Sequence, residues 1–221
     1  MRVLLAVVWK DLVSEWRSRD RVSAMAVFSL LVVVIFHFAL PEATGEEVRS
    51  NTPGLLWVAY VFSALIGLSR SFGQELENDA LSGLALAPAE RGFVFLGKAL
   101  ANFILIGLVQ AMTAAAFGLV FDIDLAAVAL PLAGITALGT LGICSVGTLI
   151  SAMSARTRFG EILMPILLLP TLIPVIAGAV RGTQDVLAGT GISFDALQLL
   201  VVVDTVYLIT SFLCFEYVLD E

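Results

Sequence analysis

The chain has 221 residues, of which 59% are hydrophobic and only 14% charged, and its formal net charge is −7. A soluble domain carries about 25% charged residues, so the excess apolar surface must face lipid. The negative charge argues against nucleic-acid binding, because phosphate contacts need clustered Lys and Arg. Cys144 and Cys214 lie far apart in apolar runs with no metal-binding spacing, and we expect them to pack as small hydrophobic side chains.

Residues 1–21 predict a separate helix that precedes the long apolar segments. One face of this helix carries four large apolar side chains, Leu5, Trp9, Leu12 and Trp16. Their spacings of three and four residues place them together, with charged residues on the other faces. Tryptophans at the membrane boundary and cations near anionic lipid are typical of a helix that lies flat in the headgroup layer. We therefore predict an N-terminal interfacial helix.

Six further segments are long and apolar enough to cross a bilayer, which takes about 20 apolar residues per helix. In chain order they are 22–40, 54–72, 99–121, 128–153, 162–180 and 196–218. The apolar stretch around the fourth exceeds one straight span, so we expect part of it to form a loop or an interfacial turn. The predicted fold is an all-α integral membrane protein, organised as a single domain over 1–221.

Two of these spans have an unusual composition. The fifth contains Pro165, Pro170 and Pro174, each of which removes a backbone donor and invites a kink. The fourth is rich in small residues, among them Gly134, Gly139, Gly142 and Gly147, and this composition indicates close approach of a neighbouring helix.

The positions of the basic residues predict the orientation of the chain. If the six spans alternate in direction, only Arg49 and Arg181 fall on one side, and the other ten of the twelve Lys and Arg fall on the opposite side. Loops with an excess of Lys and Arg stay in the cytoplasm. We therefore expect both termini on the cytoplasmic side.

The segment 74–100, between the second and third spans, combines acidic and apolar residues. Its acidic part and its leucines together form a candidate surface, Glu75, Glu77, Asp79, Leu81, Leu84 and Leu86, before Pro88 ends any helix. A short amphipathic helix of this kind suits docking into a groove of a soluble partner, and its continuity with two spans would let it transmit movement. An amphipathic loop resting on lipid fits the residues equally well.

The order of these elements resembles the ABC-2 type permeases of ABC transporters, which have an interfacial helix, six spans and an acidic coupling helix after the second. The corresponding text here is ELENDALSGLALAP at 75–88, followed by GKALAN at 97–102. Within that class the chain most resembles the CcmB family of cytochrome c maturation haem exporters. This closer resemblance depends on PGLLWVAYVFSALIGLSRSF at 53–72 and MPILLLPTLIPVIAGA at 164–179, and it covers nearly the whole chain.

The resemblance implies a set of partners and a membrane. Such permeases dimerise, dock two copies of a cytoplasmic ABC ATPase subunit and work with haem-handling membrane subunits. ATP would then be bound by the partner subunit, and haem would be cargo of the complex rather than a cofactor of this chain. The chain itself would not be an enzyme. The implied location is the bacterial inner membrane, with the mitochondrial inner membrane as the less favoured alternative.

Two sequence features suggest other chemistry but support it poorly. Gly92 to Ala99 has the spacing of a phosphate-binding loop, but Ala99 lacks the hydroxyl that would hold magnesium, and bulky residues occupy the loop positions. His37 is the only histidine and a conceivable haem ligand. A lone histidine near a membrane interface is more often hydrogen-bonded or directed to the headgroups, and we do not assign it a site.

Asp204 interrupts the sixth span and is a possible intramembrane polar site. An ionisable group at that depth normally faces the bundle interior or a wet cavity. It can line a path, form a dimer contact, or serve as a protonated or hydrogen-bonded structural residue. The candidate partners are Thr205, Gln198 and Gln110.

The sequence therefore favours an ABC permease subunit for haem export, or for release of a haem-loaded chaperone, in c-type cytochrome biogenesis. One alternative is an ABC-2 permease that exports a drug, lipid or polysaccharide. A second is a membrane assembly factor that transports nothing. A membrane-embedded enzyme is disfavoured because Asp204 stands nearly alone at membrane depth.

Overall fold

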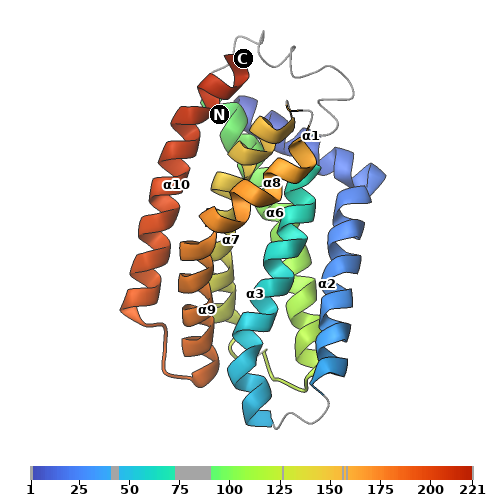
Figure 1. The fold of residues 1–221 in the computed structure, drawn as a ribbon, viewed down its shortest axis with the longest axis vertical. Coiled ribbons are helices and arrows are strands. Elements are labelled where there is room, and N and C mark those ends of the chain that lie inside the picture. The colour runs from blue at the N-terminus through green and yellow to red at the C-terminus, as the bar shows by residue number, and fades with distance from the viewer. Residues whose placement is uncertain are drawn as a thin grey trace.

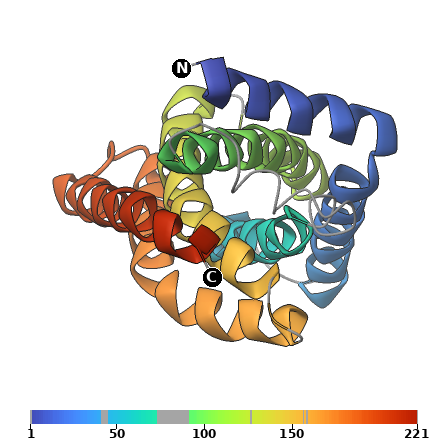
Figure 2. The ribbon, with the colours of Figure 1, turned by 90° about the horizontal axis from the view of Figure 1, so that it is seen from above.

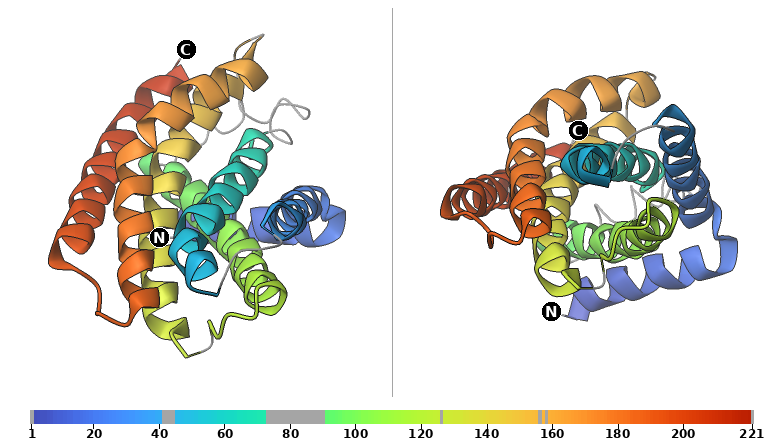
Figure 3. Two further views of the ribbon diagram at one scale, coloured as in Figure 1. Left: turned by 60° about the horizontal axis from the view of Figure 1, so that its bottom comes forward. Right: turned by 90° about the horizontal axis from the view of Figure 1, so that it is seen from below.

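The computed structural model describes residues 2–40, 45–72, 91–125, 127–155, 157 and 159–220. In these ranges every regular element is an α-helix: α1 (Arg2–Ser18), α2 (Asp20–Ala39), α3 (Gly45–Ser69), α6 (Arg91–Val120), α7 (Ala129–Ala155), α8 (Gly160–Thr171), α9 (Ile173–Ala188) and α10 (Phe194–Asp220). The long helices run side by side (Figure 1), and α1 lies across one end of the bundle (Figure 2). Seen from the other end, α2 and α10 occupy opposite edges (Figure 3).

The predicted all-α membrane fold is confirmed. Among the described residues five helices are long and apolar enough to cross a membrane, namely α2, α3, α6, α7 and α10. The pair α8 and α9 adds a sixth crossing if the two are taken as one bent span. The helix that contains the third predicted span begins at Arg91, eight residues before that span. At about 1.5 Å per residue its 30 residues extend about 45 Å, well beyond a hydrocarbon core of about 30 Å.

The predicted kink in the fifth span is present and has a definite place. Helices α8 and α9 meet at Leu172 and are bent by 55°. Pro174 lies in the first turn of α9, where its missing N–H would have been unpaired in any case. Pro165 and Pro170 lie inside α8. The chain therefore uses the proline at the break as the start of a new helix.

Helix α7 is where the bundle packs most closely. It is continuous over 27 residues, and the turn that we expected near its start lies before Ala129. A Cβ atom at Gly139 would overlap the Trp57 ring of α3, and one at Gly147 would overlap the Leu68 side chain, also of α3. The small residues of this span therefore let α3 approach its backbone, as the composition predicted.

The apolar core contains a few polar contacts that fix the helices relative to one another. Trp57 is buried and donates from Nε1 to Oγ1 of Thr183 on α9 at 3.0 Å. Tyr60, one turn later, donates from its hydroxyl to the backbone oxygen of Gln110 on α6 at 3.1 Å. Buried Trp and Tyr side chains usually find such partners.

One end of the bundle brings together parts of the chain that are distant in sequence. Helix α1, the end of α3, the start of α6 and the end of α10 all lie there (Figure 1). The two ends of the chain are thus on the same side of the bundle, which agrees with an even number of crossings. That this side faces the cytoplasm stays a prediction.

Candidate functional site at the α1 end of the bundle

The predicted coupling surface, Glu75, Glu77, Asp79, Leu81, Leu84 and Leu86, lies outside the described residues. Its two attachment points are described. On one side α3 ends at Ser69 and is followed by 70–72, and on the other side α6 begins at Arg91. We call residues 73–90, which contain the predicted coupling surface, the coupling segment. A movement of this segment would reach the described part of the chain through these two points, so the contacts that hold them define the candidate site.

Lys98 of α6 is the centre of these contacts. Its side chain is almost completely buried, and Nζ lies 3.0 Å from Oδ2 of Asp11 on α1. The same Nζ donates to the backbone oxygen of Ser71 at 2.9 Å and lies 4.8 Å from the centre of the Phe72 ring. A buried ammonium group is tolerated only with such compensation. Lys98 therefore joins α1 and α6 to the two residues that precede the coupling segment.

Asn102, one helical turn after Lys98, extends the contacts to two more helices. Its Oδ1 accepts from the Arg21 guanidinium of α2 at 2.8 Å and from the Ser71 hydroxyl at 3.0 Å. Its Nδ2 donates to Oγ1 of Thr148 on α7 at 3.0 Å. Asn102 is itself fully buried. A single amide thus links α2, the end of α3, α6 and α7.

The corner between α1 and α2 is fixed by Glu15. The carboxylate accepts from the backbone N–H of Val22 at 2.9 Å, in the first turn of α2, where an anion satisfies an otherwise unpaired donor. Arg21 Nε lies 4.0 Å from the other carboxylate oxygen. The chain turns at Arg19, which has φ of +59°, a left-handed conformation that non-glycine residues seldom adopt. Helix α1 is therefore held firmly to the start of α2.

The two faces of α1 have different surroundings. Of the four residues predicted to share a face, Leu5, Trp9 and Trp16 are 62%, 72% and 78% exposed, and Leu12 is partly buried. The opposite face contains Asp11 and Glu15, and both are buried against the bundle. The apolar face of α1 is thus free to meet lipid, while its acidic face binds the protein.

An apolar cluster lies beside the charged one. The Phe215 ring of α10 has its centre 6.5 Å from that of Phe72 and 5.4 Å from that of Phe95 on α6. Val7 of α1 belongs to the same buried group. At Gly97 a Cβ atom would come within 2.8 Å of the Val7 Cβ, so glycine is required for α1 to approach α6 this closely. Residues on both sides of the coupling segment are therefore packed into one unit.

Two other sequence features, the phosphate-loop spacing at Gly92 to Ala99 and the single histidine, do not form the sites that their sequence suggested. Gly92 to Ala99 form the first turns of the continuous helix α6, so these amides are not arranged as a phosphate-binding loop. The His37 ring lies edge-on to Phe38 and Phe121, with centres 5.7 and 5.9 Å away. Within the described part of the chain no group of three or more His, Cys, Asp or Glu could hold a metal ion.

Asp204 is buried on α10, and no hydrogen-bond partner of either carboxylate oxygen is found among the described residues. It faces α7, where a Cβ atom at Gly142 would overlap its Oδ1. Of the partners considered from the sequence, Thr205 donates to the Val201 oxygen, and Gln110 lies on α6 with its Oε1 accepting from Thr140. Asp204 is therefore packed against the backbone of α7 and is not part of a polar pair.

The sequence pattern did not identify Lys98 and Asp11 as partners. The signal that could have pointed to Lys98 is a single lysine within an otherwise apolar helical stretch, because such a group must face a partner inside the protein. Asp11 is one of the charged residues that helical spacing places away from the apolar face of α1. Nothing local in the sequence connects two residues that are so distant along the chain.

Comparison with known proteins identifies a group of similar chains. A family model described as "CcmB protein" matches residues 2–216. The chain is 31% identical over 180 residues to heme exporter protein B of Paracoccus denitrificans, which covers 80% of this chain and 81% of that protein. It is 28% identical over 199 residues to heme exporter protein B of Bradyrhizobium diazoefficiens, with coverage of 89% and 87%. The corresponding protein of Pseudomonas aeruginosa is 27% identical over 169 residues, with coverage of 75% and 74%.

Proposed function

The chain belongs to the CcmB family, and from this membership we propose that it is the membrane permease subunit of a haem exporter complex in c-type cytochrome maturation. The observation that carries the proposal is the family match over 2–216, which includes the helices α1 to α9, most of α10 and the predicted coupling surface. The helical bundle, with five continuous apolar helices and one bent pair, suits a permease.

ATP is hydrolysed in this proposal by a separate cytoplasmic subunit, and this chain supplies no catalytic residue. The stretch that has the spacing of a phosphate loop is the start of α6, with its amides inside a helix. The partner ATPase docks on the coupling surface formed by Glu75, Glu77, Asp79, Leu81, Leu84 and Leu86. The complex also contains a second copy of the chain and haem-handling membrane subunits.

The candidate site explains how a push on that surface reaches the membrane. Ser71 and Phe72 are bound to α6 itself, because Ser71 contacts both Lys98 and Asn102 and the Phe72 ring lies beside Lys98. A movement of the coupling segment therefore displaces α1, α3, α6 and α7 together and does not merely bend a loop. Packed interfaces tend to shift as units in this way, because side chains at native density do not deform continuously.

A charge-reversal experiment tests the docking surface. Replacing Glu77 and Asp79 together by Lys should weaken recovery of the ATPase subunit when the tagged chain is purified from native membranes. Asp124→Lys with Asp195→Lys is the matched control, because it makes the same charge change near the opposite end of the bundle. Equal recovery of the ATPase subunit with both variants would overturn the assignment of the coupling surface.

A labelling experiment tests the orientation. A cysteine at Asp79, in a chain with Cys144→Ser and Cys214→Ser, should resist a membrane-impermeant maleimide in intact spheroplasts and react in inverted vesicles. A cysteine at Asp195 should behave in the opposite way. Labelling of residue 79 from outside would exclude contact with a cytoplasmic ATPase. ATP-dependent haem movement in reconstituted vesicles would then separate a haem transporter from a permease for another substrate and from an assembly factor without transport.

A further inference from the structure

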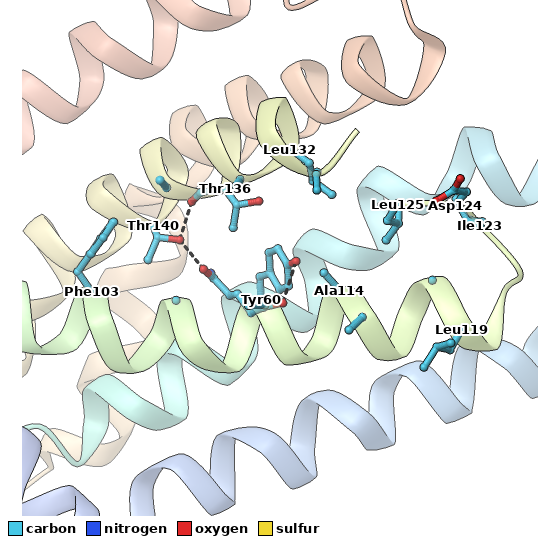
Figure 4. Close-up of a pocket in the computed structure, with 18 of the residues that line it drawn as sticks. Tyr60, Phe103, Ala114, Leu119, Ile123, Asp124, Leu125, Leu132, Thr136 and Thr140 are labelled. Atoms are coloured by element: carbon cyan, nitrogen blue, oxygen red, sulfur yellow. Dashed lines mark hydrogen bonds between the residues drawn. The ribbon is translucent and has the colours of Figure 1, made fainter. Parts of the chain in front are cut away.

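A cavity of about 930 Å³ lies between α6 and α7, away from the charged cluster. Figure 4 shows Ala114 and Leu119 of α6 on one side, Leu132 and Thr136 of α7 on the other, and Tyr60 of α3 between them. Small residues recur every four positions along both walls, at Gly107, Ala111 and Ala115 of α6 and at Ala129, Ala133 and Ala137 of α7. We refer to this cavity as the α6–α7 groove.

One polar side chain in the groove is incompletely paired. Gln110 lines the groove and is only 1% exposed. Its Oε1 accepts from the Thr140 hydroxyl at 2.6 Å, while no partner for its Nε2 is found among the described residues. Gln110 lies 19 residues after the start of α6 and 10 before its end, about 15 Å from that end at about 1.5 Å per residue, so it is inside the apolar part of the helix. An amide donor at that depth has no water to bind and needs an acceptor from the protein or a ligand.

Two glycines line the groove, and they differ in what surrounds them. A Cβ atom at Gly118 would lie 3.0 Å from the Ile123 backbone oxygen, whereas Gly107 is not required by packing within the chain. A Cβ atom at Gly107 would meet no atom within 4 Å. By contrast, a Cβ atom at Gly97, Gly139 or Gly142 would come closer than 3 Å to a neighbouring atom of the same chain. Gly107 therefore leaves space on the α6 wall that the described part of the chain does not fill. Small residues combined with a polar side chain are typical of surfaces that bind another transmembrane helix.

We propose that the α6–α7 groove is the docking site for a transmembrane helix of a different membrane subunit, which presents a hydrogen-bond acceptor to Gln110 Nε2. Lipid acyl chains could fill the space but would leave the amide unpaired, since they contain no acceptor. A symmetric contact centred on the groove would place two concave surfaces face to face and enclose a void, so the groove does not suit a second copy of this chain. The inference depends on the proposed function only in requiring a complex of several membrane subunits.

Photo-crosslinking in native membranes tests which molecule occupies the groove. A photoreactive benzoyl-phenylalanine at Ala111, which is exposed and lines the groove, should form an adduct with a distinct polypeptide. Mass spectrometry should place the adduct in a transmembrane helix that has Ser, Thr, Asn, Gln or another acceptor nearby. The same probe at Gly134, which is exposed on α7 but outside the groove, is the control. Adducts with lipid alone, or with a second copy of the chain, would overturn the proposal.

A pair of matched substitutions tests the same contact without a probe. Gly107→Leu fills the groove, whereas Gly134→Leu adds the same side chain in equally open space outside it. In complexes purified through the tagged chain, Gly107→Leu should lower recovery of the crosslinked subunit about tenfold, and Gly134→Leu should leave it unchanged. Recovery of the ATPase subunit should stay normal in both, which shows that the chain is folded and that the proposed permease role is not what fails. Full retention of the crosslinked subunit with Gly107→Leu would contradict the assignment.

Discussion

Lys98 of α6 and Asp11 of α1 form an ion pair with 3.0 Å between Nζ and Oδ2, and both side chains are buried. Removing two charges from water is costly, and mutual attraction compensates this cost only while both partners are present. The pair therefore does more than attach an interfacial helix to the bundle. It sets the position of α1 relative to the start of α6, next to the attachment points of the coupling segment.

Loss of Lys98 should destabilise the protein strongly. In Lys98→Met the Asp11 carboxylate stays buried without its partner, and breaking a buried pair in this way costs about 3–5 kcal/mol. Lys10→Met is the matched control, because Lys10 also lies near Asp11, at 3.3 Å, but its side chain is 50% exposed. An exposed pair contributes about 0–1 kcal/mol, so the control should stay close to wild type. Thermal unfolding in detergent measures the stability of both lysine variants. The double variant Asp11→Leu with Lys98→Met should recover part of the stability that Lys98→Met loses. Equal effects of the two lysine substitutions would contradict the buried role of Lys98.

Asn102 should matter for transmission more than for assembly. Asn102→Ala removes the amide that joins Arg21, Ser71 and Thr148, but leaves the coupling surface unchanged. We expect normal recovery of the ATPase subunit together with a loss of cytochrome c maturation, measured as covalently bound haem in membranes. Thr113→Val is the control, because it removes a buried interhelical hydrogen bond to Ser29 farther along α6. If membranes of the two variants contain equal amounts of covalently bound haem, the Asn102 contacts have no specific role in transmitting movement.

Gly97 should tolerate no larger side chain. A Cβ atom there would come within 2.8 Å of the Val7 Cβ and 3.0 Å of the Leu4 backbone oxygen, so Gly97→Val must push α1 away. Overpacking of this kind costs about 1–3 kcal/mol, and the displacement should also weaken the Lys98–Asp11 pair. Gly107→Ala is the control in the same helix, where the added methyl group meets nothing and raises helix propensity by up to about 1 kcal/mol. Unfolding measurements should therefore shift in opposite directions for the two variants.

The apolar segments predicted from hydropathy nearly coincide with helices α2, α7 and α10. Hydropathy gave no indication that helix α6 begins as early as Arg91, because Arg91 and Lys98 mark the end of an apolar segment in any local window. In the folded chain Lys98 meets Asp11, and Arg91 donates to the backbone oxygen of Glu216 at 3.1 Å. These partners come from the two ends of the sequence, and a local pattern contains no information about them.

Local sequence patterns were also insufficient to place the break between α8 and α9 and to show which residues of α1 face the bundle. The prolines predicted a kink in the fifth span, and only the packed structure places the break at Leu172. The outer face of α1 followed from helical spacing alone, since Leu5, Trp9 and Trp16 must lie together. That Asp11 and Glu15 turn inward depends on basic groups in α6 and α2, which spacing within α1 cannot reveal.

Substitution of Asp204 can separate a packing role of this buried side chain from a functional one. Neither oxygen has a hydrogen-bond partner among the described residues, and the carboxyl group lies against the backbone of α7 at Gly142. If the residue only fills this space, Asp204→Asn keeps its shape without its charge, and both complex assembly and cytochrome maturation should be preserved. Gly142→Ala should instead destabilise the protein by about 1–3 kcal/mol, because the added methyl group overlaps the carboxyl oxygen whichever role the group has. Co-purification of the partner subunits and covalently bound haem are the two measurements for Asp204→Asn. Normal assembly with lost maturation would show that the carboxyl group itself, and not its volume, is needed, and Asp204 would then belong to the working part of the permease.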